Sequence, residues 1–161
     1  MNLEVDIQSA TSEPVPDEDD IRSWILNALA GAGRTDGEWE VSLRLVDEAE
    51  MARLNEAYRH KSGPTNVLSF PADLPAELGL GLLGDIVICA PVIRREAGEQ
   101  GKSETAHWAH MAVHGTLHLL GYDHIDPEEA AAMESLETAV LTQLNYPCPY
   151  EGLSPEERVA P

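Results

Sequence analysis

Cysteine is scarce in this chain of 161 residues, which contains only Cys89 and Cys148. The two lie far apart in the sequence, and neither belongs to a CxxC pair, so a zinc site built from cysteines is disfavoured. Cys89 ends the apolar run IVIC, which favours a buried, unreactive thiol in a strand. Any metal site therefore has to draw on other side chains.

Basic residues are also few, since 10 Lys and Arg stand against 29 Asp and Glu and give a formal charge of -19. A protein that coats nucleic acid would present a basic surface, so we expect no DNA partner and no broad affinity for RNA. The acidic residues gather in the ranges 13–20, 126–137 and 151–157, which we interpret as solvated surface or tail. A local cationic site remains compatible with this charge.

Long apolar runs are missing, because no stretch approaches the ~20 residues that a membrane-spanning helix needs. We therefore expect no membrane partner. The first residues, MNLEVD, alternate and are acidic, and they lack the basic and apolar regions of a signal peptide. The predicted location is the cytoplasm.

Apolar periodicity predicts about four strands and five helices. Alternation at residues 3–7 and 39–45 and short apolar runs at 66–70 and 83–89 indicate the strands. Helical spacing predicts helices at about 17–31, 47–58, 91–98, 103–120 and 126–144, and Asp47 with Glu50 resembles a capping box. The mixed order favours a single α+β domain over residues 1–144, followed by a flexible C-terminal tail at 145–161.

Three histidines form the most informative pattern in the chain. His114 and His118 stand four residues apart, so on a helix their imidazoles share one face. Gly121 can adopt a positive φ, end the helix and turn the chain so that His124 becomes a third ligand. Three neutral nitrogens leave a fourth position for water, which is typical of a catalytic site with one Zn²⁺ ion. Nickel, copper or iron would also suit these ligands.

The same spacing occurs in the metzincin proteases, whose signature is HExxHxxGxxH. The glutamate of that signature is the general base of the protease, and Gly115 occupies its position here. A zinc peptidase or amidohydrolase would need another base. We interpret His107 and His110, on the same predicted helix, as surface or core residues rather than ligands.

Three sequence blocks resemble the YbeY family, bacterial endoribonucleases of rRNA maturation. Residues 114–124, HGTLHLLGYDH, are similar to the family hallmark HGxLHLxGYDH. Residues 58–71, YRHKSGPTNVLSFP, resemble its block ending in PTNVLSFP, and residues 83–88, LGDIVI, match its LGDIxI strand. The departures are Ser62, where aspartate is common, and Cys89, where serine is common.

The resemblance implies an α+β fold with a mixed sheet around a zincin-like HxxxH helix. It implies a metal-dependent, single-strand-specific endoribonuclease that matures the 3′ end of small-subunit rRNA and supports ribosome quality control. An rRNA precursor and the ribosome or its small subunit would be the partners. By the same resemblance His114, His118 and His124 are the zinc ligands, His114 belongs to the catalytic centre, and Arg59 is the cation of its cleft.

The chemistry of the residues agrees with this implication. A zinc ion polarises a phosphoryl oxygen and lowers the pKa of its bound water to about 7. A guanidinium stabilises the charge that develops on the phosphate, so we predict that Arg59 is catalytic and binds substrate, with Lys61 as a second substrate contact. Ordinary solvated charges are the alternative for both. Asp85 is interpreted as a base, a brace for a ligand or only a backbone partner, and Arg94 or Arg95 as a further cation of the cleft.

Two other functions stay open. One is a zinc peptidase or amidohydrolase with a base other than the missing glutamate. The other is a non-catalytic ribosome-assembly factor in which zinc only stabilises the fold. For the nuclease, the nucleophile is either zinc-bound water or the 2′-hydroxyl of the RNA.

Overall fold

The computed structural model describes residues 2–72, 81–123 and 125–150, and the helices and strands of this part follow the predicted order. The strands are β1 (Asn2–Ala10), β2 (Glu38–Val46), β3 (Val67–Pro71) and β4 (Leu82–Cys89). The helices are α1 (Glu18–Gly31), α2 (Glu48–Arg59), α3 (Ala90–Gln100), α4 (Glu104–Leu119) and α5 (Pro127–Gln143). The predicted α+β class, with four strands and five helices, is confirmed for the described residues.

The strands form one mixed sheet in the order β1-β2-β4-β3. β1 is parallel to β2 and β2 to β4, whereas the edge strand β3 is antiparallel to β4. The register places Ile86 of β4 opposite Leu43 of β2 on one side and Ser69 of β3 on the other. Ile86 thus lies inside the sheet, next to the edge strand, and its side chain is fully buried.

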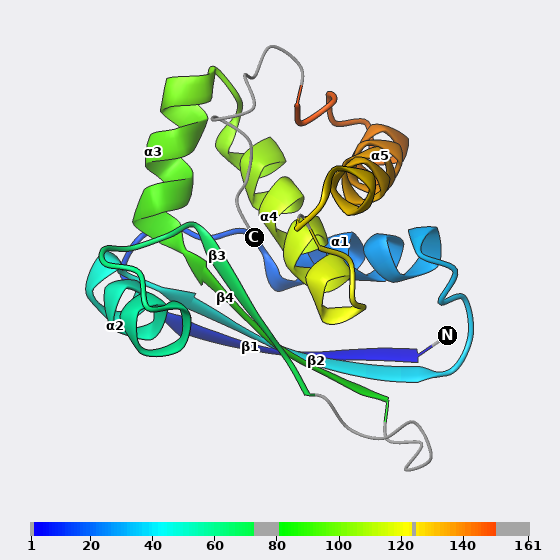
Figure 1. Ribbon diagram of the computed structural model, residues 1–161, viewed down its shortest axis with the longest axis horizontal. Coiled ribbons are helices and arrows are strands. Elements are labelled where there is room, and N and C mark those ends of the chain that lie inside the picture. Colours follow the sequence, from blue (N-terminus) through cyan, green and yellow to red (C-terminus); the bar gives the residue numbers. More distant parts are fainter. Residues whose placement is uncertain (1, 73–80, 124, 151–161) are drawn as a thin grey trace.

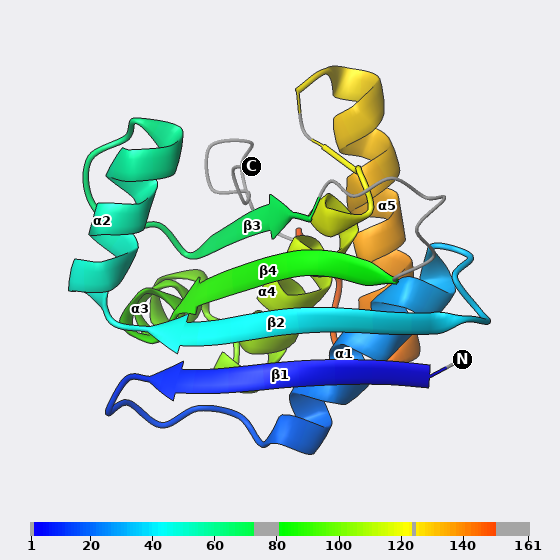
Figure 2. The ribbon, with the colours of Figure 1, turned by 90° about the horizontal axis from the view of Figure 1, so that it is seen from below.

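Four helices, α1, α3, α4 and α5, lie on one face of the sheet (Figure 1). α4 is the central one, since it packs against the other three helices and against β3 and β4. α2 lies near one end of the sheet. Figure 2 shows the other face of the sheet, where no described helix lies in front of the strands. No helix in the described part of the chain is long and apolar enough to cross a membrane. The core is built from side chains of all these layers, including Ile25, Leu29, Leu43, Ile86, Ile88, Met111, Leu117 and Met133.

The helix starts were predicted with mixed success. The side chain of Ser103 caps α4 by accepting a hydrogen bond of 3.1 Å from the first turn. The capping box predicted for α2 is wrong, because Asp47 accepts a hydrogen bond from Thr11 and caps no backbone group. Glu50 instead accepts two hydrogen bonds from Arg44, at 2.6 and 3.0 Å. Glu50 thus forms two hydrogen bonds to a cationic guanidinium in place of the single bond that it would accept from a backbone N–H in a capping box.

The segment after residue 144 contacts the domain in its described part. The ring of Tyr146 packs edge-on against Trp24, with centroids 6.5 Å apart, and Tyr150 is only 8% exposed. Residues 151–161 lie outside the described part of the chain. The division into a domain of residues 1–144 and a flexible tail stays a prediction.

Gly115 allows α4 to approach the sheet closely. A Cβ atom at this position would lie 2.9 Å from Cγ2 of Ile86 and 3.3 Å from Oγ of Ser69. The hydroxyl of Ser69 also donates a hydrogen bond of 3.1 Å to the carbonyl of Gly115. A glutamate, the residue of the metzincin signature at this position, therefore has no room without separating α4 from β4.

We expect Gly115→Ala to lower the free energy of unfolding by up to about 2 kcal/mol. Alanine favours a helix by about 1 kcal/mol over glycine, but overpacking against a buried, β-branched side chain costs about 1–3 kcal/mol. Gly98→Ala in α3 is the matched control, because its added Cβ would meet no atom within 4 Å beyond its chain neighbours and the backbone of its own helix. It should stabilise the protein by about 0.5–1 kcal/mol. Urea unfolding of both variants measures the difference, and equal stabilities would contradict this account of the packing.

Candidate functional site

Four histidines lie on α4, and neighbouring rings contact one another along the helix. The ring centroids of His107 and His110 are 6.1 Å apart, those of His110 and His114 6.2 Å, and those of His114 and His118 4.7 Å. Spacings of three and four residues place all four on one side of the helix. His107, His110 and His114 are fully buried and His118 is partly exposed.

The predicted pair of ligands, His114 and His118, is brought together by the structure. Their rings are the closest pair on the helix, at an interplanar angle of 71°, and the Nε2 atoms of both are shielded from solvent. The third predicted ligand, His124, lies outside the described residues. Two of the three predicted imidazoles are therefore placed side by side, as the helical spacing predicted.

The turn after α4 has the geometry that was predicted for Gly121. This residue adopts a φ of 102°, and its N–H donates to the carbonyl of His118 at 3.0 Å. The N–H of Tyr122 donates to the carbonyl of Leu117 at 3.1 Å, which completes a Schellman motif. The chain consequently reverses direction immediately after the two histidines.

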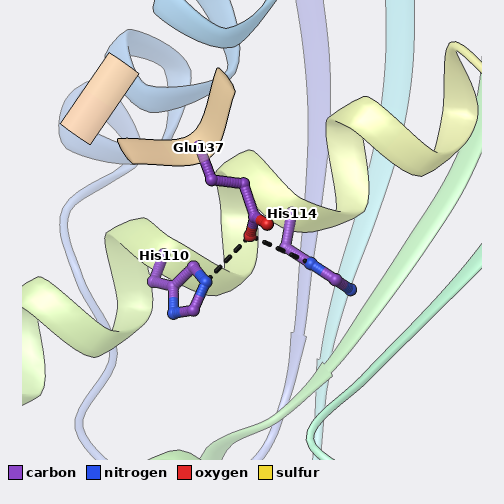
Figure 3. Close-up of side chains that lie close together, drawn as sticks. All are labelled: His110, His114 and Glu137. Carbon is purple, nitrogen blue, oxygen red and sulfur yellow. Dashed lines mark hydrogen bonds and ion pairs between the residues drawn. The ribbon is translucent and has the colours of Figure 1, made fainter. Parts of the chain in front are cut away.

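A buried carboxylate on α5 meets α4 between two histidines. Oε2 of Glu137 lies 2.8 Å from Nε2 of His110 and 3.1 Å from Nδ1 of His114 (Figure 3). The hydroxyl of Tyr150 donates to Oε1 of the same carboxylate at 2.6 Å. The ligand atoms of His110, His114 and Glu137 all lie within 4.8 Å of one another, so this cluster could hold a metal ion.

The ionisation of this cluster determines which nitrogens carry hydrogen. Burial would raise the pKa of Glu137, but the charge interaction with His114 and hydrogen bonds from His110 and His114 outweigh it and lower that pKa well below its usual range. Burial lowers the pKa of His110 to about 4, against the attraction of Glu137. At neutral pH Glu137 is ionised and only accepts, so Nε2 of His110 and Nδ1 of His114 carry the hydrogens. In a neutral His114 ring, the lone pair is then on Nε2.

A second buried histidine is paired in a similar way. Nε2 of His107 lies 2.9 Å from Oε1 of Glu96 in α3, and the side-chain amide of Asn66 donates to the same oxygen at 3.1 Å. Burial would raise the pKa of Glu96, but these two hydrogen bonds and the charge interaction with His107 lower it. Through Glu96, this pair connects α3 and the residue before β3 to α4. It does not include His114 or His118.

A pocket of about 270 Å³ connects the histidine helix to the predicted cation. Arg59, the last residue of α2, lines it together with His118 and Asp123. The other lining residues among those described are Ser69, Pro71, Gly121 and Tyr122. Arg59 forms no ion pair with any carboxylate in the described ranges, whereas Lys61, two residues further on, does not line the pocket.

The other charged candidates lie elsewhere, which corrects their interpretation. Arg94 and Arg95 are each paired with glutamates at N–O distances of 3.0–3.6 Å and do not line the pocket. Asp85 lines a separate cavity of about 440 Å³ with Arg44 and Glu50. Its alternation along β4 turns its side chain away from the helices, because Ile86 next to it faces α4.

Glu137 was missed as a site residue in the sequence, although a signal was present. It lies four residues after Met133 and four before Leu141, and these two apolar residues belong to the buried face of α5. A carboxylate on an apolar helical face is rare unless it has a buried partner. Tyr150 carried no comparable signal, since it lies among prolines beyond the last periodic residue.

Comparison with known proteins agrees with the sequence blocks. The family model of endoribonuclease YbeY matches residues 6–145. The endoribonuclease YbeY of Pseudomonas syringae pv. tomato is 56% identical over 149 residues, covering 92% of this chain and 88% of its own length. That of Pseudomonas putida (strain W619) is 55% identical over 149 residues, covering 92% and 93%.

The fold has also been seen in a solved structure. A solution structure of a protein from Thermotoga maritima superimposes with a TM-score of 0.57 and covers 96% of this chain and 100% of its own, at 22% identity. At this identity the likeness concerns the fold alone. The family model and the curated relatives both cover most of the chain, and the chain therefore belongs to the YbeY endoribonuclease family.

Proposed function

We propose that this protein is a zinc-dependent, single-strand-specific endoribonuclease of the cytoplasm. Its substrate is an rRNA precursor whose small-subunit 3′ end it matures, and it takes part in ribosome quality control. The observation that carries the proposal is the pocket that Arg59 and His118 both line, because it combines a guanidinium with an imidazole of the family's histidine motif. Membership of an endoribonuclease family supports phosphodiester cleavage as the reaction.

One zinc ion is proposed to bind to His114, His118 and His124. The closeness of the rings of His114 and His118 supports this, and so does the hydrogen on Nδ1 of His114, which leaves Nε2 for the ion. The turn at Gly121 supports the return of the chain toward the same site. When bound, zinc in such a site polarises a phosphoryl oxygen and provides a water of low pKa.

The protein side chains have separate tasks in this proposal. Arg59 pairs with the non-bridging oxygens of the scissile phosphate, where charge accumulates during cleavage. His114 belongs to the catalytic centre as a ligand whose orientation is fixed by its surroundings. Lys61, outside the pocket on the loop after α2, binds the RNA backbone next to the cleaved bond.

The size of the pocket supports the proposed preference for single strands. Its volume of about 270 Å³ is below the ~300–1,000 Å³ of typical small-molecule sites, so we propose that it takes one nucleotide unit at a time. Single-stranded loops and ends of RNA can present such a unit in an extended form. Because the chain has a formal charge of -19, we propose that the ribosome or its small subunit presents the precursor.

The alternative of a zinc peptidase loses support from the packing of α4. Gly115 has no room for the glutamate that activates water in metzincins, since an added Cβ would already lie 2.9 Å from Ile86. Asp123 is the one carboxylate among the described lining residues. A non-catalytic ribosome-assembly factor is the remaining alternative, and the following experiment separates all three.

The direct test is cleavage of a labelled rRNA precursor that extends beyond the small-subunit 3′ end. We expect purified protein to cleave it, a chelator to abolish cleavage and added zinc to restore it. His118→Ala should bind zinc weakly and should not be rescued by it. Absence of turnover at full zinc occupancy would favour the assembly factor, and cleavage of casein in place of RNA would favour the peptidase.

Arg59→Ala should lower the rate of RNA cleavage by about 10²–10³, the usual effect of removing one donor from a developing negative charge. Zinc content and melting temperature should stay near those of the wild type, because Arg59 is exposed and forms no ion pair in the described ranges. Arg53→Ala is the control, since Arg53 is an exposed arginine of the same helix that does not line the pocket. Unchanged cleavage by Arg59→Ala would remove this residue from the mechanism.

Free single-stranded RNA should bind weakly and with little dependence on salt. Two or three neutralised phosphates give a slope of log K against log salt of about -1.4 to -2.1, from about -0.7 per phosphate. Fluorescence anisotropy with a labelled oligonucleotide between about 50 and 200 mM salt measures this slope. A slope near -4, which corresponds to six phosphates, would show a basic surface that the ion-paired Arg94 and Arg95 do not provide.

A further inference from the structure

Three hydrogen bonds converge on the carboxylate of Glu137, which is fully buried. His110 and His114 of α4 share Oε2, at 2.8 and 3.1 Å, and Tyr150 binds Oε1 at 2.6 Å. The hydroxyl of Tyr150 also lies 3.3 Å from Nε2 of His110. Three parts of the chain, α4, α5 and the segment after α5, are thus joined at one side chain.

These contacts occupy three of the four lone pairs of the carboxylate, including both on the oxygen next to the imidazoles. Both sites on Oε2 accept from histidine nitrogens, and Oε1 accepts from a phenol. An ion placed within the cluster would have to displace the hydrogens on Nε2 of His110 and Nδ1 of His114 and would break both hydrogen bonds. An ion on the far nitrogen of His114, Nε2, breaks none of them and lies on the side of the ring opposite to Glu137.

We propose that Glu137 is a positioning residue for the metal site, held by Tyr150 and His110 so that it fixes the His114 ring with Nε2 toward the ion. The cluster of His110, His114 and Glu137 then orients His114 as a ligand, and the metal ion does not bind inside the cluster. This inference rests on the metal site of the proposed function. It adds the residues that determine the tautomer and orientation of a ligand.

The expected effect is large because such outer contacts act on the ligand itself. A carboxylate hydrogen-bonded to the second nitrogen of a ligating histidine fixes the ring and makes it more basic, and its loss typically lowers metal affinity by 10–100-fold. Tyr150 acts one step further away, by holding the carboxylate. The segment after α5 therefore contributes to metal affinity although it supplies no ligand.

The test is a zinc titration of the chelator-treated protein against a chromophoric competitor, without RNA. Glu137→Gln should raise the Kd for zinc by about 10–100-fold, because an amide offers one acceptor oxygen to three donors. Tyr150→Phe keeps the ring and removes only the hydroxyl, and it should raise the Kd by about threefold to tenfold. Urea unfolding of each zinc-free variant measures the loss of stability separately.

Matched controls distinguish positioning from general destabilisation. Glu96→Gln makes the same change at a partly buried carboxylate that binds His107 of the same helix and does not contact His114. It should lose stability and keep its zinc Kd within about threefold of the wild type, well below the effect of an outer contact. Tyr146→Phe is the control for Tyr150→Phe, since its ring packs on Trp24 and its hydroxyl makes no hydrogen bond in the described part.

Several outcomes would overturn the inference. Equal zinc Kd values for Glu137→Gln and Glu96→Gln would show that Glu137 is only structural. A loss of zinc binding in His110→Ala with retention in His118→Ala would show that the cluster itself ligates the ion. If Glu137→Gln does not fold, the zinc Kd of Tyr150→Phe tests the inference instead. A zinc Kd equal to that of Tyr146→Phe would then contradict it. Wild-type protein that binds zinc and cleaves no RNA would contradict the proposed function and leave this inference intact.

Discussion

The burial of α4 on nearly every side is the constraint on which the site depends. This helix packs against the sheet and against three other helices, yet it carries imidazoles on one side for its whole length. A buried imidazole needs a hydrogen-bond partner, because an unsatisfied polar group in the interior costs about 1–3 kcal/mol. Glu96 from α3 and Glu137 from α5 bind one nitrogen of each of the three buried rings, and each connects a neighbouring helix to α4. The polar pairs thus determine how the helices pack, and the packing determines where the histidines point.

The acidic charge of the chain divides into two kinds of carboxylate. Most acidic residues lie on the surface, where several pair with the arginines of α3 and β2 and leave those cations unavailable to a phosphate. Glu96 and Glu137 face inward and bind histidines. Arg59 differs from the ion-paired arginines of α3 and β2. It lines the same pocket as His118 and forms no ion pair in the described part of the chain. This strongly acidic protein therefore has an arginine without an ion pair, in its described part, at the pocket of the histidine helix.

Most of the fold could be predicted from the sequence, because each element has an apolar period of its own. The alternation of Val41, Leu43 and Leu45 is sufficient to indicate a buried strand face, and the spacing of His114 and His118 is sufficient to place them together. What could not be predicted depends on partners far apart in the chain. Glu137 lies in a run of acidic residues that reads as solvated surface, and only its place between Met133 and Leu141 distinguishes it.

The same limit explains the other errors. The capping box at Asp47 failed because Arg44, on a preceding strand, competes for Glu50 with a stronger interaction. Asp85 was a candidate base by residue type, but the alternation along β4 places it with Arg44 and Glu50, away from His118. Local patterns determine which residues share a face of one element, whereas the neighbours of that face depend on the assembled sheet and helices.

Gly115 and Glu137 together show how this site differs from that of a metzincin. In the protease signature a carboxylate next to the first histidine activates water. Here the contact of α4 with Ile86 excludes a side chain at that position, so the carboxylate near His114 comes from α5 and binds the opposite nitrogen of the ring. A carboxylate that accepts three hydrogen bonds, two of them from imidazoles, holds the His114 ring from its Nδ1 side. Glu137 does not line the pocket of Arg59, His118 and Asp123, so in the proposed function the residue that orients His114 is not the group that accepts a proton from the nucleophile.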